Sequence, residues 1–149
     1  MPTLLADPNF KLYVLCCAIL SLEMLVLAGM TAGKRANRKN YLNPEDVKVA
    51  FKDATLIDGG EHPDVARVQR AHRNLNEGLP MFFALGLISV LAGASPLGVK
   101  ICLAAFTAAR MIHAIVYINA VQPFRTMMYA IGSFALIGLA VMSVLAVLS

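Results

Sequence analysis

Residues 127–148 read MMYAIGSFALIGLAVMSVLAVL and contain no charged side chain. A helix needs about 20 consecutive, mainly apolar residues to cross the hydrocarbon core of a bilayer. The polar groups of this stretch are limited to serine and tyrosine hydroxyls, which transmembrane helices tolerate. The stretch therefore predicts a membrane-spanning helix, and it sets the fold class as that of an integral membrane protein.

Three further apolar runs precede it. Residues 12–32 are interrupted only by small polar residues and Glu23, and residues 97–117 form a second long run. The run 79–94 is shorter, but a polar helical pattern beginning near residue 65 continues into it. Short connections between long helices are typical of a helical bundle. We expect an all-α, four-helix membrane bundle in one domain, 1–149, with spans at about 12–33, 66–94, 97–119 and 124–148.

The composition agrees with a membrane location. Hydrophobic residues make up 58% of the 149-residue chain and charged residues 15%, and the mean hydropathy is +0.68. Soluble domains carry about 25% charged residues, so a soluble fold of this size would expose apolar surface. Disorder, a secreted disulfide scaffold and a simple cytosolic enzyme are excluded. The net charge of +4 is not accompanied by a basic-aromatic nucleic-acid motif, so we expect no nucleic-acid partner.

The basic residues predict the topology. All of the thirteen Lys and Arg residues except Lys11 and Lys100 fall in or beside the first and third connections. Cytoplasmic connections of membrane proteins carry the excess of basic residues. We therefore expect a multi-pass protein whose first and third connections face the cytoplasm and whose termini face the lumen or periplasm.

Polar side chains recur at helical spacing within the expected spans. Residues at i, i+3, i+4 and i+7 share one face of a helix, and ionisable residues at membrane depth are costly and tend to be functional. Converging stripes would build a polar cavity near the cytoplasmic face, with arginines suited to carboxylates. The pattern predicts a site for a small, mainly anionic ligand. The stripes are Arg70, Arg73, Asn74 and Glu77, then Arg110, His113 and Tyr117, then Arg125 and Tyr129.

Simpler interpretations stay open for several of these residues. Arg70 could be a solvated or phospholipid-facing charge. Arg73, with Asn74 and Glu77, could form an interhelical ion pair. Tyr117 or Tyr129 alone would fit the aromatic belt at the membrane interface.

Two other features bear on the chemistry. The histidines have no metal-ligand spacing with Cys or Asp, so we expect no metal site. Glu23 lies in the middle of the first span, and we expect it to pair with an arginine of a neighbouring helix.

Four motifs, in this order and spacing, carry a family resemblance. They are Asn43-Pro44-Glu45-Asp46, the run VQRAHRNLNE at 68–77, the run RMIHAIVY at 110–117, and Pro123-Phe124-Arg125-Thr126 followed by Tyr129. Over almost its whole length the chain resembles the MAPEG family, the membrane-associated proteins in eicosanoid and glutathione metabolism. The resemblance is closest to the branch of prostaglandin E synthases and microsomal glutathione transferases.

The resemblance implies a homotrimer that binds glutathione between adjacent subunits, near the cytoplasmic face. It implies supporting basic positions at Arg70 and Arg110, and it matches Asp46 to a residue discussed as catalytic in the prostaglandin branch. The positions that match glutathione ligands are Arg35, Arg73, Asn74, Glu77, His113, Tyr117, Arg125 and Tyr129.

The chemistry of glutathione suits such a cavity. The tripeptide has two carboxylates, an ammonium and a thiol, and its thiolate is the nucleophile. A neighbouring guanidinium favours the thiolate; we assign this role to Arg125, with Thr126 or Tyr129 donating a hydrogen bond. The chain departs from the branch at Thr126, where the prostaglandin synthase has serine, and at Glu23, where a basic residue is usual.

The expected function is that of a membrane-bound glutathione transferase acting on lipophilic electrophiles from the bilayer, with peroxidase activity on lipid hydroperoxides. One alternative is a glutathione-dependent isomerase like the prostaglandin E synthases. A second is a non-catalytic membrane scaffold or lipid-binding protein.

Overall fold

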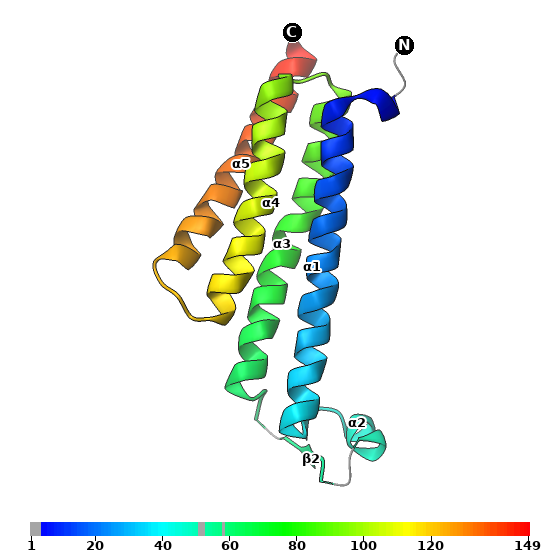
Figure 1. Ribbon diagram of the computed structural model, residues 1–149, viewed down its shortest axis with the longest axis vertical. Coiled ribbons are helices and arrows are strands. Elements are labelled where there is room, and N and C mark those ends of the chain that lie inside the picture. The colour runs from blue at the N-terminus through cyan, green and yellow to red at the C-terminus, as the bar shows by residue number, and fades with distance from the viewer. Residues whose placement is uncertain (1–3, 51–52, 58) are drawn as a thin grey trace.

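The computed structural model describes residues 4–50, 53–57 and 59–149. Four long helices dominate the chain (Figure 1). A 3-10 turn, η1 (Leu4–Ala6), precedes them. The long helices are α1 (Pro8–Arg38), α3 (Pro63–Leu91), α4 (Pro96–Ile118) and α5 (Phe124–Leu148).

Each long helix is long enough and apolar enough to cross a membrane, which confirms the predicted all-α membrane bundle. Proline stands in the first turn of α1, α3 and α4, where its missing N–H costs nothing and its fixed φ favours the helix. Asp7 caps α1, because its Oδ1 accepts from the backbone N–H of Asn9 (2.7 Å) and of Phe10 (3.1 Å). These local signals explain why the helices begin where they do.

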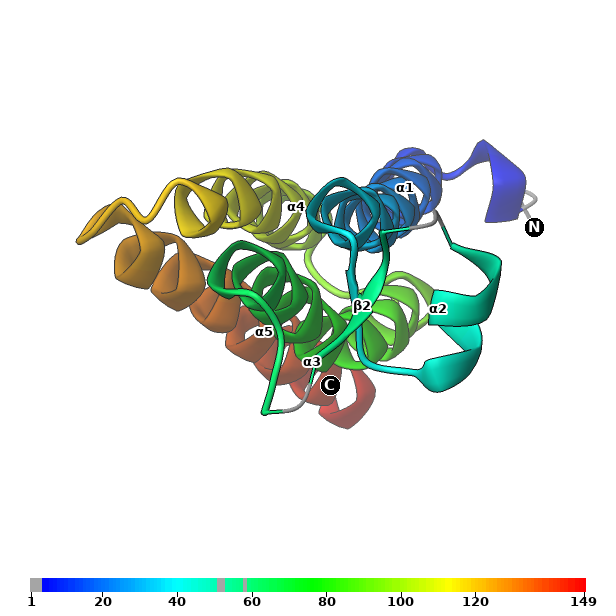
Figure 2. The ribbon, with the colours of Figure 1, turned by 90° about the horizontal axis from the view of Figure 1, so that it is seen from below.

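The four helices form two layers. Seen from below, α1 and α4 lie in one layer, and α3 and α5 lie in the other (Figure 2). Within the described ranges, α1 packs on α3 and α4, whereas α5 packs on α3 and α4 and makes no contact with α1. The two termini lie at the same end of the bundle (Figure 1), as an even number of spans requires.

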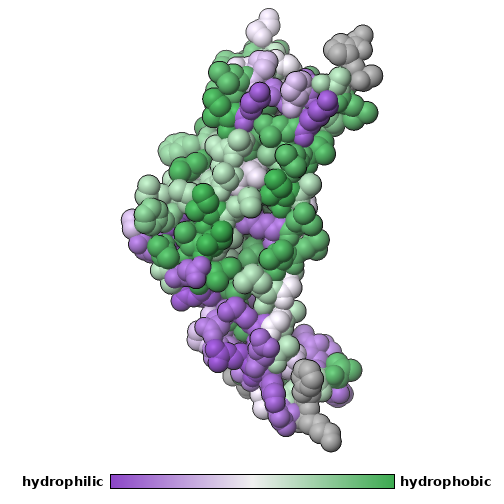
Figure 3. Space-filling view, viewed as in Figure 1, coloured by the Kyte–Doolittle hydropathy of each residue, from purple (hydrophilic) through white to green (hydrophobic). Residues whose placement is uncertain are grey.

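Aromatic and aliphatic side chains fill the space between the layers. Phe82 of α3 stacks on Phe106 of α4 with ring centroids 4.5 Å apart, a geometry that adds to the gain from burial. Leu20, Leu103 and Leu139 are fully buried around this pair. Figure 3 shows hydrophobic surface over the middle of the bundle and hydrophilic surface gathered mainly at its lower end, as expected of a protein that spans a bilayer.

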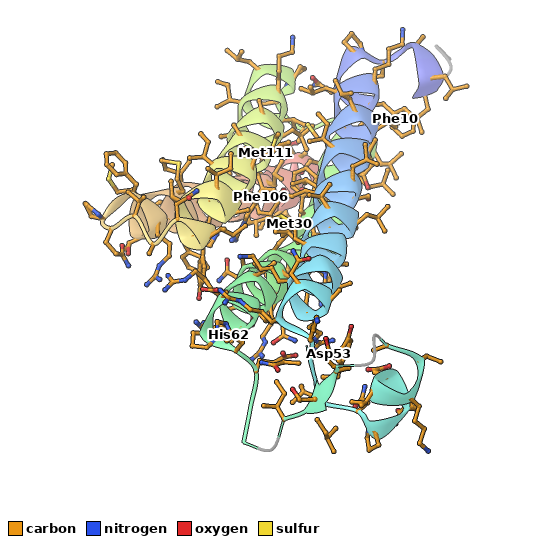
Figure 4. All side chains as sticks on the ribbon, turned by 60° about the horizontal axis from the view of Figure 1, so that its bottom comes forward. Phe10, Met30, Asp53, His62, Phe106 and Met111 are labelled. Carbon is orange, nitrogen blue, oxygen red and sulfur yellow. The ribbon has the colours of Figure 1, made fainter. Side chains whose placement is uncertain are left out.

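The polar connection between α1 and α3 has a structure of its own. It contains α2 (Pro44–Val49) and the short strands β1 (Asn40–Tyr41) and β2 (Thr55–Leu56), which pair in parallel. These strands are not predicted from the sequence, because a two-residue strand has no periodicity to detect. The connection lies beyond the lower ends of α1 and α3, where Asp53 and His62 are seen in Figure 4.

Candidate functional site

The site is organised around Arg110 of α4, whose residue surface is only 3% exposed. Its Nη1 donates a hydrogen bond to Oδ1 of Asn74 on α3 at 3.0 Å. Its guanidinium carbon lies 5.1 Å from the ring centroids of Phe106 and of Tyr129, the latter on α5. Cations over aromatic faces are attracted by the ring quadrupole, so Arg110 joins α3, α4 and α5 at one point.

Two glycines make room for this guanidinium. A Cβ at Gly78 would lie 3.1 Å from Nη2 of Arg110, and one at Gly132 would lie 3.3 Å from Nε. A Cβ at either position would be a tight contact that requires Arg110 to shift by a few tenths of an ångström, because packed interiors leave few voids. Neither glycine is among the predicted site residues. Their place in the sequence was a signal, because Gly78 directly follows Glu77 and Gly132 lies three residues after Tyr129.

An aromatic cluster extends the site toward the start of α5. The ring of His113 lies 5.5 Å from that of Tyr117 and 6.2 Å from that of Tyr129. The guanidinium of Arg125 lies over the Tyr117 ring, 4.8 Å from its centroid. His113 is buried, whereas Tyr129 is exposed and Arg125 half-buried. The structure thus brings six predicted residues into one connected group: Asn74, Arg110, His113, Tyr117, Arg125 and Tyr129.

Gln122 is a further polar residue beside Arg125. With its amide oxygen turned toward the guanidinium, it accepts from Nη2 at 2.7 Å and from Nε at 3.1 Å. Its amide nitrogen then lies 3.3 Å from the Thr126 hydroxyl. Gln122 therefore contacts both predicted catalytic residues of α5, Arg125 and Thr126. Its role is not predicted from the sequence, because glutamine is common in connections.

The charged stripe of α3 is exposed beside this group. Arg70, Arg73 and Glu77 are all exposed, and within residues 4–50, 53–57 and 59–149 none of them has an ion-pair or side-chain hydrogen-bond partner. The interhelical ion pair considered for Arg73 and Glu77 is therefore not formed within the described chain. Two cations and one carboxylate on one face leave the stripe available to a ligand that carries both signs of charge.

Arg35 and Asp46 are not part of the connected group, and each has a partner of its own. Arg35 forms an ion pair with Glu61, whose Oε1 accepts from its Nε at 2.7 Å and from Gln69 at 3.1 Å. Asp46 is on α2 and accepts a hydrogen bond from Asn43 at 3.0 Å. Figures 1 and 2 place α2 on the opposite side of the bundle from the turn between α4 and α5. A single chain does not bring Asp46 to Arg125 and Thr126.

Glu23 does not have the partner expected for it. Both of its carboxylate oxygens are buried without a hydrogen-bond partner in the described chain, and it forms no direct ion pair there. Metal ligands do not cluster in the part of the chain that the structure describes: no three His, Cys, Asp or Glu residues lie close enough to hold an ion.

Four apolar spans with a basic and aromatic site among α3, α4 and α5 define an integral membrane helical bundle with a polar site. The model of the MAPEG family matches residues 13–145, and the chain belongs to this family.

Individual relatives cover most of the chain. Prostaglandin E synthase of Bos taurus is 32% identical over 121 residues, covering 80% of this chain and 77% of the relative. Prostaglandin E synthase of Rattus norvegicus is 32% identical over 129 residues, with coverages of 86% and 82%. Microsomal glutathione S-transferase 1 of Homo sapiens is also 32% identical over 129 residues, with coverages of 85% and 83%.

Proposed function

We propose that the protein is a membrane-bound glutathione transferase, which uses the glutathione thiolate to attack lipophilic electrophiles and reduces lipid hydroperoxides. The observation that carries this proposal is the exposed stripe of Arg70, Arg73 and Glu77 beside the Arg110–Tyr129–His113–Tyr117–Arg125 group. Glutathione has two carboxylates, an ammonium and a thiol, and this set of cations with one free carboxylate suits them. The similarity to microsomal glutathione S-transferase 1 supports the assignment.

The residues have distinct roles in this proposal. Arg70 and Arg73 hold carboxylates, and Glu77 holds the ammonium, by charge-assisted hydrogen bonds. Asn74 accepts a hydrogen bond from Arg110, and this pair lies beneath the bound peptide in the proposal. His113, Tyr117 and Tyr129 line the site between α4 and α5 with polar aromatic edges.

Arg125 stabilises the reacting sulfur. A thiol of ordinary pKa is mostly protonated at neutral pH, and an adjacent guanidinium favours its ionised form. Gln122 and the ring of Tyr117 hold Arg125, and Thr126 or Tyr129 donates a hydrogen bond to the sulfur. The thiolate then attacks the electrophile to form a sulfur–carbon bond. With a hydroperoxide it attacks the terminal oxygen, the O–O bond breaks, and the alcohol leaves with a proton. The resulting glutathione sulfenic acid reacts with a second glutathione to give the disulfide and water. The lipophilic substrate arrives from the bilayer, where apolar compounds concentrate.

We propose a homotrimer, because Arg35 and Asp46 of one subunit would then reach the site of its neighbour. Within the described chain, α1 makes no contact with α5, and α2 lies on the opposite side of the bundle from the start of α5 (Figure 1), so a neighbouring subunit would supply Arg35 and Asp46. We also propose that the site faces the cytoplasm and that the termini face the lumen or periplasm. The basic residues at the lower end of the bundle support this orientation.

Detergent-solubilised protein tests the proposal directly. Addition of glutathione should produce the ultraviolet absorbance of a bound thiolate, and chlorodinitrobenzene and cumene hydroperoxide should be consumed in a glutathione-dependent reaction. Arg125→Ala should abolish the thiolate band while the protein stays trimeric. Folded trimer with no thiolate band and no turnover would instead favour the non-catalytic scaffold or lipid-binding protein.

A second candidate is a glutathione-dependent isomerase acting on a prostaglandin endoperoxide. The similarity to the prostaglandin E synthases of Bos taurus and Rattus norvegicus favours it. The same thiolate would open the endoperoxide without net consumption of glutathione. Turnover of the endoperoxide far above that of the two electrophiles, with glutathione regenerated, would select this candidate.

A further inference from the structure

A cavity lies at the end of the bundle that carries both termini, away from the proposed glutathione site (Figure 1). α1 begins there at Pro8, α3 ends there at Leu91, and α4 begins there at Pro96. The cavity has a volume of about 370 Å³, and ligand sites usually measure about 300–1,000 Å³. Helices that cross a bilayer end near the level of the lipid headgroups, and Figure 3 shows hydrophilic side chains on this upper end. The cavity therefore lies where headgroups are concentrated.

The lining of the cavity combines apolar residues with a few polar ones. The polar residues are Asp7 and Asn9 at the start of α1 and Lys100 of α4. Apolar walls with a small number of polar groups are typical of sites that bind small molecules. The other lining residues are Pro8, Val90, Gly93, Ala94, Pro96 and Leu97.

Asp7 and Asn9 supply hydrogen-bond acceptors. Oδ1 of Asp7 caps α1, whereas its Oδ2 has no partner within the described residues. Asn9 is only 9% exposed, and its Nδ2 donates to the carbonyl oxygen of Pro96 at 3.0 Å, which ties the start of α1 to the start of α4. Oδ1 of Asn9 accepts no hydrogen bond within the same residues. Both side chains therefore keep an oxygen available to a donor in the cavity.

Lys100 supplies a positive charge to the same cavity. It is exposed, and within residues 4–50, 53–57 and 59–149 it forms no ion pair, with Asp7 or with any other carboxylate. A lysine near the end of a membrane helix extends its ammonium group toward the headgroups. A cation and an anion that line one cavity without neutralising each other suit a ligand that carries both charges.

We propose that this cavity binds a zwitterionic phospholipid whose headgroup has a primary ammonium, a phosphatidylethanolamine. Lys100 binds the phosphate, and Asp7 and Asn9 accept hydrogen bonds from the ammonium. The apolar walls contact the glycerol and the first carbons of the acyl chains. This site is separate from the glutathione site and does not depend on the proposed function.

The acceptors predict which headgroup is preferred. A primary ammonium has three N–H donors, as a lysine side chain does, whereas the trimethylammonium of phosphatidylcholine has none. Phosphatidylglycerol offers the phosphate but no cation for Asp7. We therefore expect phosphatidylethanolamine to bind about two- to fivefold better than either lipid, since exposed charged contacts contribute up to about 1 kcal/mol.

The test is a lipid competition in the full-length protein. The protein is reconstituted with phosphatidylethanolamine, phosphatidylcholine and phosphatidylglycerol in equal amounts and with the same acyl chains, extracted in mild detergent, and its bound lipids are counted by native mass spectrometry. Wild type should be enriched in phosphatidylethanolamine over both other lipids. Lys100→Gln should lower retention of all three about two- to fivefold, because each has a phosphate. Asp7→Asn should remove the preference over phosphatidylcholine, and it keeps the helix cap because asparagine caps as well as aspartate.

Lys11→Gln is the matched control. Lys11 is an exposed cation one turn further along α1, and it does not line the cavity. This variant should retain lipids as wild type does. An equal loss in Lys11→Gln and Lys100→Gln would mean that the overall charge of this end attracts lipids, and would overturn the site. Equal binding of the three lipids by wild type would overturn it too.

A soluble arm separates the lipid from its headgroup. Glycerophosphoethanolamine has the same charges and no acyl chains, so it should neither displace the lipid nor raise the Tm. Phosphatidylethanolamine should raise the Tm of wild type and of Lys11→Gln by a few degrees, and that of Lys100→Gln less, because a ligand stabilises the folded state that binds it. Displacement of the lipid by glycerophosphoethanolamine at the same concentration would make the site one for a soluble phosphate ester and would overturn the assignment to a phospholipid.

Discussion

The cations at the end of α1 and those of α3, α4 and α5 differ in how they are paired. Arg35, Arg38 and Lys39 form ion pairs with Glu61, Asp64 and Asp53 respectively. The Lys and Arg residues of α3, α4 and α5 form no ion pair within the described residues. They are Arg67, Arg70, Arg73, Lys100, Arg110 and Arg125.

The difference separates two uses of positive charge. These pairs fasten the polar connection to the ends of α1 and α3, so Arg35, Arg38 and Lys39 each have an anion already. Arg110 and Arg125 contact aromatic rings and amides, which hold a guanidinium in place without neutralising it. A guanidinium held in this way keeps its charge for a ligand. Arg70 and Arg73 are exposed on α3. Substitutions in the two groups should therefore affect different properties.

Arg125→Ala should have the largest effect. It removes the positive charge proposed to stabilise the thiolate, and loss of one such preorganised group costs about 10²–10³-fold in kcat. Steady-state kinetics with chlorodinitrobenzene measure the loss. The Tm should change little, because Arg125 is only half-buried. A variant with undiminished conjugating activity would remove Arg125 from the mechanism.

Glu77→Gln should have the next largest effect, on binding. A charge-assisted hydrogen bond contributes about 1.5–3 kcal/mol, so the Kd for glutathione should rise about ten- to hundredfold. Equilibrium binding by calorimetry measures this change. Asn76→Asp, on the neighbouring exposed position of α3, is the control for altered charge. If the affinity for glutathione is unchanged in Glu77→Gln, the free carboxylate of α3 does not bind the ammonium.

The sequence predicted the four membrane spans and the polar stripe of α4. The four spans followed from hydropathy alone, because a bilayer demands long apolar helices. Helical spacing placed Arg110, His113 and Tyr117 on one stripe, and the structure joins that stripe to Asn74, Arg125 and Tyr129. The spacing of residues within a helix decides which of them share a face, so this feature can be predicted from the sequence alone.

The remaining features depend on contacts between distant segments. The pairing of Arg35 with Glu61 depends on how the polar connection folds back, and that connection carries no periodic pattern. The space for Arg110 depends on Gly78 and Gly132 meeting it from two other helices. Glu23 was expected to find an arginine partner, yet it is buried without direct contact to one. Such facts are set by packing, and a single sequence does not contain them.

Glu61→Gln should have a moderate effect on Tm and on glutathione binding. It tests whether a paired cation at the end of α1 also binds the ligand. It removes the anion from Arg35, which is 28% exposed at its side chain, whereas Glu61 is 7% exposed. The Tm should fall by several degrees, because a partly buried charge loses its partner. If Arg35 also serves the site of a neighbouring subunit, its release should tighten glutathione binding about two- to fivefold, and Arg35→Ala should weaken it. Unchanged affinity in both variants would assign Arg35 to structure alone.

Asp64→Asn should have the smallest effect, because its ion pair with Arg38 is exposed on both sides. Exposed ion pairs contribute little, since solvent and salt screen them and the long side chains lose entropy in pairing. We expect kcat, KM and the trimer to stay as in the wild type, and any small loss of Tm to vanish when the ionic strength is raised. A salt-sensitive gain of glutathione affinity in this variant would place Arg38 among the ligand-binding cations. The division between paired and unpaired cations would then follow exposure to the ligand rather than the helix on which each cation lies.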